Sequence, residues 1–400
     1  MNKVNKILEN TLFREFSLYS FSTLLFQASR VLVELAAAKI LGPAIWGVWY
    51  FLNLAIAYRS FTYLGIVNGM NREVPIKLGG DRKEEAEELK NATFSIVTIS
   101  AALTSAALFI STLLINDEYL IKTIYFLIPL FITTQFYYLV NAKLRAEALF
   151  EKISQIQIIF ALAFPILAIP LSVIIGLEGF ILGFTLALAT TLIFAYRKGL
   201  FDYSFYFDSR KIKKLISVGF PIMLIGITYT FLSTADRWII GLLIGTEALG
   251  YYSLAIIVFS AMSLFPRVIS EQLYPKMAFD WGKTKSRDAL EKWVDLQTKY
   301  TAYMIIPVLT IVLFTVPKII RLWLPEYEPG ISAIQIIVFG ALFKPFSAGW
   351  GNVLNIIDKQ TWYLAIIIIA VIINLGLNYV LVLVGYGIEG VALGTALTYC

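Results

Sequence analysis

The sequence is dominated by long apolar runs that are separated by short polar segments. A membrane hydrocarbon core about 30 Å thick requires about 20 apolar residues in a helix. By this measure we expect an all-α polytopic membrane protein. Its complete spans are predicted at residues 17–38, 46–68, 92–115, 119–140, 154–175, 179–196, 215–239, 246–269, 299–320, 331–355 and 361–384.

A twelfth apolar run begins near Gly387 and continues to Cys400. Fourteen helical residues at about 1.5 Å each extend roughly 21 Å, which is less than the core thickness. We therefore expect this last helix to be truncated in the sequence as given.

Composition excludes several classes of function. Hydrophobic residues make up 58% of the chain and charged residues 15%, against roughly 45–50% and about 25% in soluble domains. The chain has no histidine and a single cysteine, Cys400. Histidine-based triads, zinc sites and an intramolecular disulfide are therefore excluded. We expect no enzymatic activity, no metal and no cofactor.

The net charge of +6 is explained by membrane topology. With a cytoplasmic N-terminus, 24 of the 33 Lys and Arg residues fall in inner segments, five at outer ends and four within spans. Cytoplasmic loops carry such an excess of basic residues. This pattern predicts a multi-pass protein of the cytoplasmic membrane, and it argues against nucleic acid as a partner.

The two halves of the chain resemble one another. The segment Gly176-Leu-Glu-Gly matches Gly387-Ile-Glu-Gly at a shift of 211 residues, and 41–50 matches 244–253 at a shift of 203. Because six spans separate the copies, both halves cross the membrane in the same direction. We expect two pseudo-symmetric six-helix lobes, 1–196 and an incomplete 215–400, that are joined by a cytoplasmic loop at 197–214.

Charged residues inside predicted spans indicate a structural or functional role, because inserting each one at mid-membrane costs roughly 2.5–3.5 kcal/mol. Arg30, Arg59, Arg267 and Lys344 outnumber Glu34 among the deepest positions. Guanidinium groups match phosphate oxygens, so these four cations predict a cavity for an anionic headgroup such as a pyrophosphate. Two alternatives stay open: Arg30 and Glu34 form a structural pair, and Arg267 extends to the inner interface.

Three further residues are candidates for coupling or gating. Glu34 lies beside Arg30 on the first span, and Asp236 and Arg237 lie toward the outer end of the seventh. Polar amides also recur within the spans, namely Gln27, Asn53, Gln135, Gln157, Asn374 and Asn378. Such amides suit sugar hydroxyls in a cavity, and interhelical hydrogen bonding is the alternative.

Several segments together resemble the polysaccharide biosynthesis, or O-antigen-type, flippases of the multidrug/oligosaccharidyl-lipid/polysaccharide exporter superfamily. The segments that carry this resemblance are Ala38-Lys-Ile-Leu-Gly-Pro-Ala-Ile-Trp-Gly-Val-Trp, Gly219-Phe-Pro, Ala235-Asp-Arg-Trp-Ile-Ile-Gly, Leu249-Gly-Tyr-Tyr, Leu322-Trp-Leu-Pro-Glu-Tyr and Gly387-Ile-Glu-Gly-Val-Ala-Leu-Gly.

This resemblance implies export of a polyprenyl-pyrophosphate-linked oligosaccharide by alternating access. Related lipid II flippases have cavity arginines on their first, second and eighth helices, and Arg30, Arg59 and Arg267 lie on those helices here. The implied partners are membrane lipids and the glycan polymerase and glycosyltransferase machinery. A multidrug or cation antiporter of the same fold is the alternative. A membrane glycan polymerase or ligase fits less well, because every predicted outer loop is short.

Overall fold

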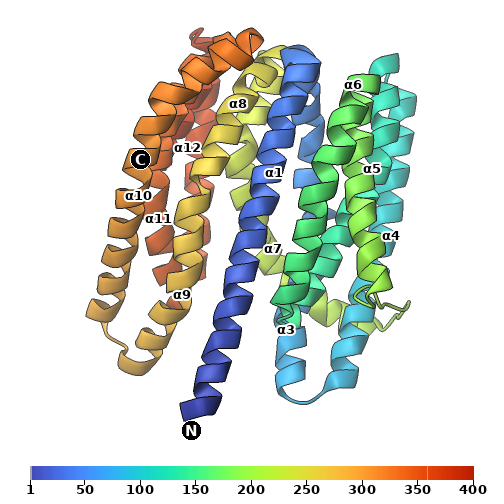
Figure 1. The fold of residues 1–400 in the computed structure, drawn as a ribbon, viewed down its shortest axis with the longest axis vertical. Coiled ribbons are helices and arrows are strands. Elements are labelled where there is room, and N and C mark those ends of the chain that lie inside the picture. Colours follow the sequence, from blue (N-terminus) through green and yellow to red (C-terminus); the bar gives the residue numbers. More distant parts are fainter. Residues whose placement is uncertain (1, 358) are drawn as a thin grey trace. The chain divides into compact units, whose positions relative to one another are not determined.

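The computed structural model describes residues 2–357 and 359–400, and the side chains of all of these except 2–16, 264–268, 271–272, 275 and 344–348. The described chain consists of helices and turns, without a strand (Figure 1). The helices are α1 (Asn2–Ala57), α2 (Arg59–Thr62), α3 (Ile66–Gly79), α4 (Lys83–Ser111), α5 (Glu118–Ala146), α6 (Phe150–Arg197), α7 (Ser209–Leu243), α8 (Thr246–Met262), α9 (Leu264–Thr284), α10 (Arg287–Trp323), α11 (Ile331–Ile356), α12 (Gln360–Leu383) and α13 (Gly387–Tyr399), with single 3-10 turns at Thr112–Leu114 and Pro325–Gly330.

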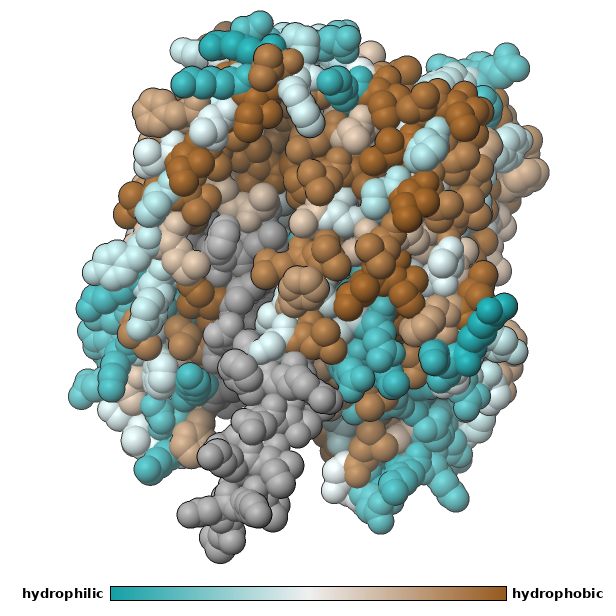
Figure 2. All heavy atoms as spheres, in the orientation of Figure 1, coloured by the Kyte–Doolittle hydropathy of each residue, from teal (hydrophilic) through white to brown (hydrophobic). Residues whose placement is uncertain are grey.

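The predicted all-α membrane fold is confirmed. Seven described helices are each long and apolar enough to cross a membrane. The helix α6 holds two predicted spans, and α1 holds one span and the start of the next, because α1 is kinked at Gly42 and α6 at Ile175 and Gly176. Both glycines have positive φ angles, 71° and 67°, which a residue with a Cβ rarely adopts. On the face drawn in Figure 2, apolar side chains gather over the helices and hydrophilic ones over the loops.

The second predicted span, 46–68, is not one continuous helix. It consists of the end of α1, the single turn of α2 and the start of α3. Between α2 and α3 the backbone passes through Leu64 and Gly65, whose φ angles are 50° and 75°. A membrane helix is interrupted in this way only where the freed backbone groups are buried in protein or line a cavity. Arg59 is the first residue of α2, the isolated turn.

The internal repeat also appears in the packing of the helices. A Cβ on Gly47 would collide with the carbonyl of Thr246, and a Cβ on Gly250 would collide with that of Pro43. Both pairs are related by the same shift of 203 residues that aligns the two sequence segments. The two copies therefore contact each other reciprocally, as a pseudo-two-fold arrangement requires.

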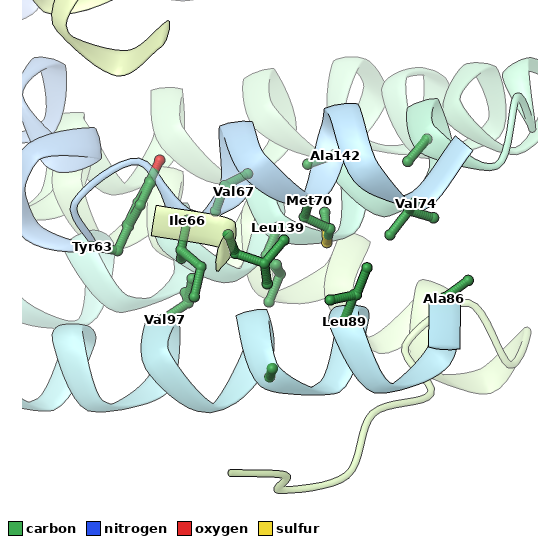
Figure 3. Packing of buried hydrophobic residues seen from close by; sticks show 13 residues of the cluster. Tyr63, Ile66, Val67, Met70, Val74, Ala86, Leu89, Val97, Leu139 and Ala142 are labelled. Atoms are coloured by element: carbon green, nitrogen blue, oxygen red, sulfur yellow. The ribbon is translucent and has the colours of Figure 1, made fainter. Parts of the chain in front are cut away.

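The chain divides into two compact units, one of Met1–Leu41 and Ala55–Ile227, the other of Gly42–Leu54 and Thr228–Cys400. The core of the first unit lies where α3, α4 and α5 meet the start of α7 (Figure 3). Ile66, Met70 and Val74 of α3 contribute fully buried side chains to it. Gly219 of α7 packs so closely on Gly65 that a Cβ would meet the opposing carbonyl.

The segment between α6 and α7 is extended and lies along α4 of the same unit. The backbone N–H of Ser204 donates to Asn91 Oδ1 over 3.0 Å, and that of Tyr206 donates to Ser95 Oγ over 2.9 Å. The Tyr203 ring stacks on Phe94 at a centroid distance of 5.0 Å. These contacts explain why the first half of α7 belongs to the first unit.

Candidate functional site

Arg30 and Glu34 form an ion pair on α1. Their atoms Nη2 and Oε1 are 3.2 Å apart, one helical turn along the sequence. The two side chains are only 35% and 18% exposed. The structure thus contains the neutralising pair that the sequence allowed, and the arginine side chain is partly exposed.

Arg59 lies in the break of the second span and has a different environment. Its Nη1 donates to the carbonyl of Ile56 over 3.1 Å. Its guanidinium carbon lies 3.2 Å from the centroid of the Tyr138 ring on α5. The Nε atom is buried without a hydrogen-bond partner, and no carboxylate of the described residues forms an ion pair with this arginine. Among the described residues, its charge is therefore stabilised mainly by a ring face and one carbonyl.

A polar network supports the isolated turn that begins at Arg59. Thr62 Oγ1 donates to the Arg59 carbonyl over 2.7 Å and accepts from Ser100 Oγ at 2.8 Å and from Gln135 Nε2 at 3.2 Å. In the described part of the chain, the buried Gln135 Oε1 and Thr134 Oγ1 have no hydrogen-bond partner. Buried polar atoms of this kind are usually satisfied by protein, water or ligand.

One of two adjacent tyrosines on α5 contacts Arg59, and sequence reasoning missed both. Tyr138 stacks on Arg59, and Tyr137 beside it is buried. The two rings contact each other edge to face, with centroids 5.8 Å apart. The sequence offers only a Tyr-Tyr pair inside a span, a pattern that more often belongs to ordinary packing.

Asp236, in the second unit, is buried and fully hydrogen-bonded. Its Oδ2 accepts from the Tyr252 hydroxyl at 2.5 Å. Its Oδ1 accepts from Thr395 Oγ1 at 2.6 Å and from Asn378 Nδ2 at 3.1 Å. Asn378 also donates to Asn374 Oδ1 over 3.2 Å. The network joins α7, α8, α12 and α13 around one carboxylate.

Arg237 has partners different from those of Asp236, its neighbour in the sequence. Its guanidinium carbon lies 5.3 Å from the centroid of the Tyr50 ring. Its Nε is buried and has no hydrogen-bond partner among the described residues. Because successive helical residues point about 100° apart, the two side chains contact different helices.

The two other predicted cations, Arg267 and Lys344, lie on α9 and α11, and their side chains are outside the described residues. Of the predicted amides, Gln157 Oε1 accepts from Ser22 Oγ at 2.8 Å and from Thr23 Oγ1 at 3.2 Å. This amide connects two helices, as do Asn374 and Asn378. Among the residues whose positions are described, no group of three acidic or cysteine side chains could hold a metal ion.

Comparison with known sequences places this geometry in context. Residues 18–327 match a protein family described as polysaccharide biosynthesis protein. The chain is also 27% identical over 195 residues to an uncharacterized membrane protein, MJ1068, of Methanocaldococcus jannaschii. That match covers 48% of this chain and 38% of the relative, so it spans well under half of the relative's length.

Solved structures share the fold. An inward-facing multidrug resistance MATE family transporter of the MOP superfamily superimposes with a TM-score of 0.79, covering 93% of this chain and 91% of the transporter at 16% identity. The lipid II flippase MurJ, in an inward closed conformation, gives a TM-score of 0.76 over 96% of this chain and 85% of the flippase, again at 16% identity.

Proposed function

The chain belongs to the polysaccharide biosynthesis protein family, and from this premise we propose that it is a flippase for a polyprenyl-pyrophosphate-linked oligosaccharide. It moves this substrate across the cytoplasmic membrane by alternating access of its two lobes, 1–196 and 215–400, with the N-terminus in the cytoplasm. The family and the fold shared with a lipid II flippase support this proposal. The excess of basic residues in the inner loops supports the orientation.

The observation that carries the proposal is the environment of Arg59. A cation without a carboxylate partner is costly inside a membrane helix and marks a functional site by default. Arg59 also lies at an interrupted helix, the feature by which transporters expose binding groups at mid-membrane. A phosphate would supply the missing negative charge through charge-assisted hydrogen bonds. Arg30, whose side chain is 35% exposed, is a second cation of the same unit that a phosphate would meet.

The remaining predicted residues take supporting roles in this proposal. Arg267 and Lys344 extend the cationic lining that meets the pyrophosphate. Glu34 limits the charge of Arg30 when the site is empty. Asp236 and Arg237 serve in coupling or gating, because a carboxylate that joins four helices is sensitive to their rearrangement. The substrate would come from glycosyltransferases on the inner face and pass to a glycan polymerase on the outer face.

The second candidate function is a multidrug or cation antiporter of the same fold. It is favoured by the TM-score of 0.79 to the MATE transporter and by the buried carboxylate of Asp236. An antiporter for cationic drugs requires a negative binding surface, whereas the deep side chains of the first unit include Arg59, which forms no ion pair with a carboxylate of the described residues. The flippase therefore accounts for more of the observed geometry.

Reversing the charges of the site tests the proposal. The double variant Arg30→Glu, Arg59→Glu should abolish appearance of the glycan on the cell surface, because carboxylates repel a pyrophosphate. The measurement is surface labelling of the glycan at matched levels of membrane-inserted protein. Arg210→Glu is the control, since Arg210 is exposed in the first turn of α7. Normal export by the double variant, together with loss of drug resistance, would instead support the antiporter.

A further inference from the structure

We propose that Tyr138 is a positioning residue that holds the Arg59 guanidinium in place to bind a phosphate. This inference rests on the proposed function and adds a residue to its site. The Tyr138 ring lies 3.2 Å from the guanidinium carbon of Arg59. The tyrosine is 37% exposed, so the pair lies at the edge of the packed core and not within it.

Stacking leaves the hydrogen-bonding edge of the arginine available. A guanidinium interacts with an aromatic ring through its flat face, while its five N–H donors point outward in its own plane. One of these donors, on Nη1, is used by the carbonyl of Ile56. The N–H on Nε is buried without a partner. The stacked arginine therefore retains donors for an anion.

The backbone around the break also restrains Arg59. Ile56 lies in the last turn of α1, where helical carbonyls lack partners within the helix. The isolated turn of α2 is held by Thr62, whose hydroxyl accepts from Ser100 and Gln135. Arg59 is thus fixed by its backbone, by one carbonyl and by the Tyr138 ring. Such preorganisation lowers the cost of ordering a long side chain when a ligand binds.

A competing interpretation predicts the opposite change in anion affinity when Tyr138 is removed. If Tyr138 only stores Arg59 away from the ligand in the empty transporter, its removal should tighten anion binding. If Tyr138 positions Arg59, its removal should weaken binding. The phenolic hydroxyl is not required in either case, because the ring face makes the contact. Phenylalanine at this position should therefore behave like tyrosine.

The experiment measures binding of geranylgeranyl pyrophosphate to the purified full chain in nanodiscs, with geranylgeraniol as the uncharged comparison. Loss of this cation–π contact should weaken binding of the anion, so we expect Tyr138→Leu to raise the Kd for the pyrophosphate about tenfold, which corresponds to about 1.4 kcal/mol. Tyr138→Phe should stay within about twofold of wild type. Arg59→Gln should raise the Kd at least as much, and adding Tyr138→Leu to it should change nothing further.

Two controls separate positioning from general damage. Tyr125→Leu removes another exposed tyrosine of α5 and should leave the Kd unchanged. Tyr138→Met is the second variant if Tyr138→Leu fails to fold, and geranylgeraniol binding should be the same in all variants. Unchanged or tighter pyrophosphate binding in Tyr138→Leu, beside weak binding in Arg59→Gln, overturns this inference alone. Wild-type binding in Arg59→Gln overturns the proposed function as well.

Discussion

Arg59 and Asp236 are both charged residues within membrane helices, and their environments are opposite. Asp236 is buried and accepts hydrogen bonds from three side chains on three other helices. Arg59 donates one hydrogen bond to a carbonyl, stacks on a ring and has a buried Nε without a partner. Among the described residues, the first unit thus contains a charge with few polar partners, and the second contains a charge satisfied by the protein itself.

This difference indicates how a charge in a membrane helix can serve stability or binding. A fully hydrogen-bonded carboxylate stabilises the packing of the helices that supply its donors, and its removal leaves those donors buried and unsatisfied. A cation with few polar partners adds little to stability, because one carbonyl and a ring face offset only part of the cost of its burial. Stability should therefore depend strongly on Asp236 and weakly on Arg59, whereas substrate binding should depend strongly on Arg59.

The largest expected effect is that of Asp236→Ala. The change leaves Tyr252, Thr395 and Asn378 without their shared acceptor, and at about 1 kcal/mol each we expect a loss of about 3 kcal/mol in the free energy of unfolding. The measurement is an SDS titration of the purified protein in mixed micelles. The matched variant Arg59→Ala should lose about 1 kcal/mol or less. Equal losses in the two variants would show that Asp236 and Arg59 contribute equally to stability, contrary to this prediction.

An intermediate effect is expected for Asn378→Ala. This change removes one donor to Asp236 and the contact with Asn374, while Tyr252 and Thr395 still satisfy the carboxylate. We expect a loss of about 1–2 kcal/mol in the same titration. In the background of Asp236→Ala the further loss should shrink, because the two residues share one network. Full additivity would show that the network does not act as a unit.

The smallest effect is expected for Thr62→Val, which is nearly isosteric. It removes the hydroxyl that accepts from Ser100 and Gln135 next to Arg59. Interhelical hydrogen bonds in membranes contribute about 0.6 kcal/mol on average, so we expect a loss of about 1 kcal/mol for the pair. A loss as large as that of Asp236→Ala would mean that the surroundings of Arg59 are also primarily structural.

Much of the fold follows from local sequence. The apolar runs locate the helices, and the repeated glycine segments predict two related halves, whose copies contact each other at Gly47 and Gly250. The spacing of Arg30 and Glu34 predicts their ion pair. The interruption of the second span at Leu64 and Gly65 was not predicted. Polar residues such as Arg59 and Thr62 lower the hydropathy there, but a criterion of about 20 apolar residues does not resolve a break of one helical turn.

The candidate site could be predicted only in part. Charge and position within the predicted spans identify Arg59 and Asp236 as candidates for a structural or functional role. Their partners could not be predicted, because Thr395 is 159 residues and Asn378 is 142 residues from Asp236. Tyr138 was missed for the same reason, since its sequence neighbours give no sign that its ring would lie against an arginine of another span.

The sequence by itself determined that this chain is a membrane protein of repeated helices with an excess of cations within its spans. Hydrophobic length and helical hydrogen bonding are local properties, so each span can be recognised without its neighbours. Only the tertiary structure decided which of the described charged groups are fully hydrogen-bonded and which keep a donor without a partner among the described residues. That outcome depends on side chains from distant helices, because in a membrane a buried charge must be stabilised by groups of the protein or of its ligand.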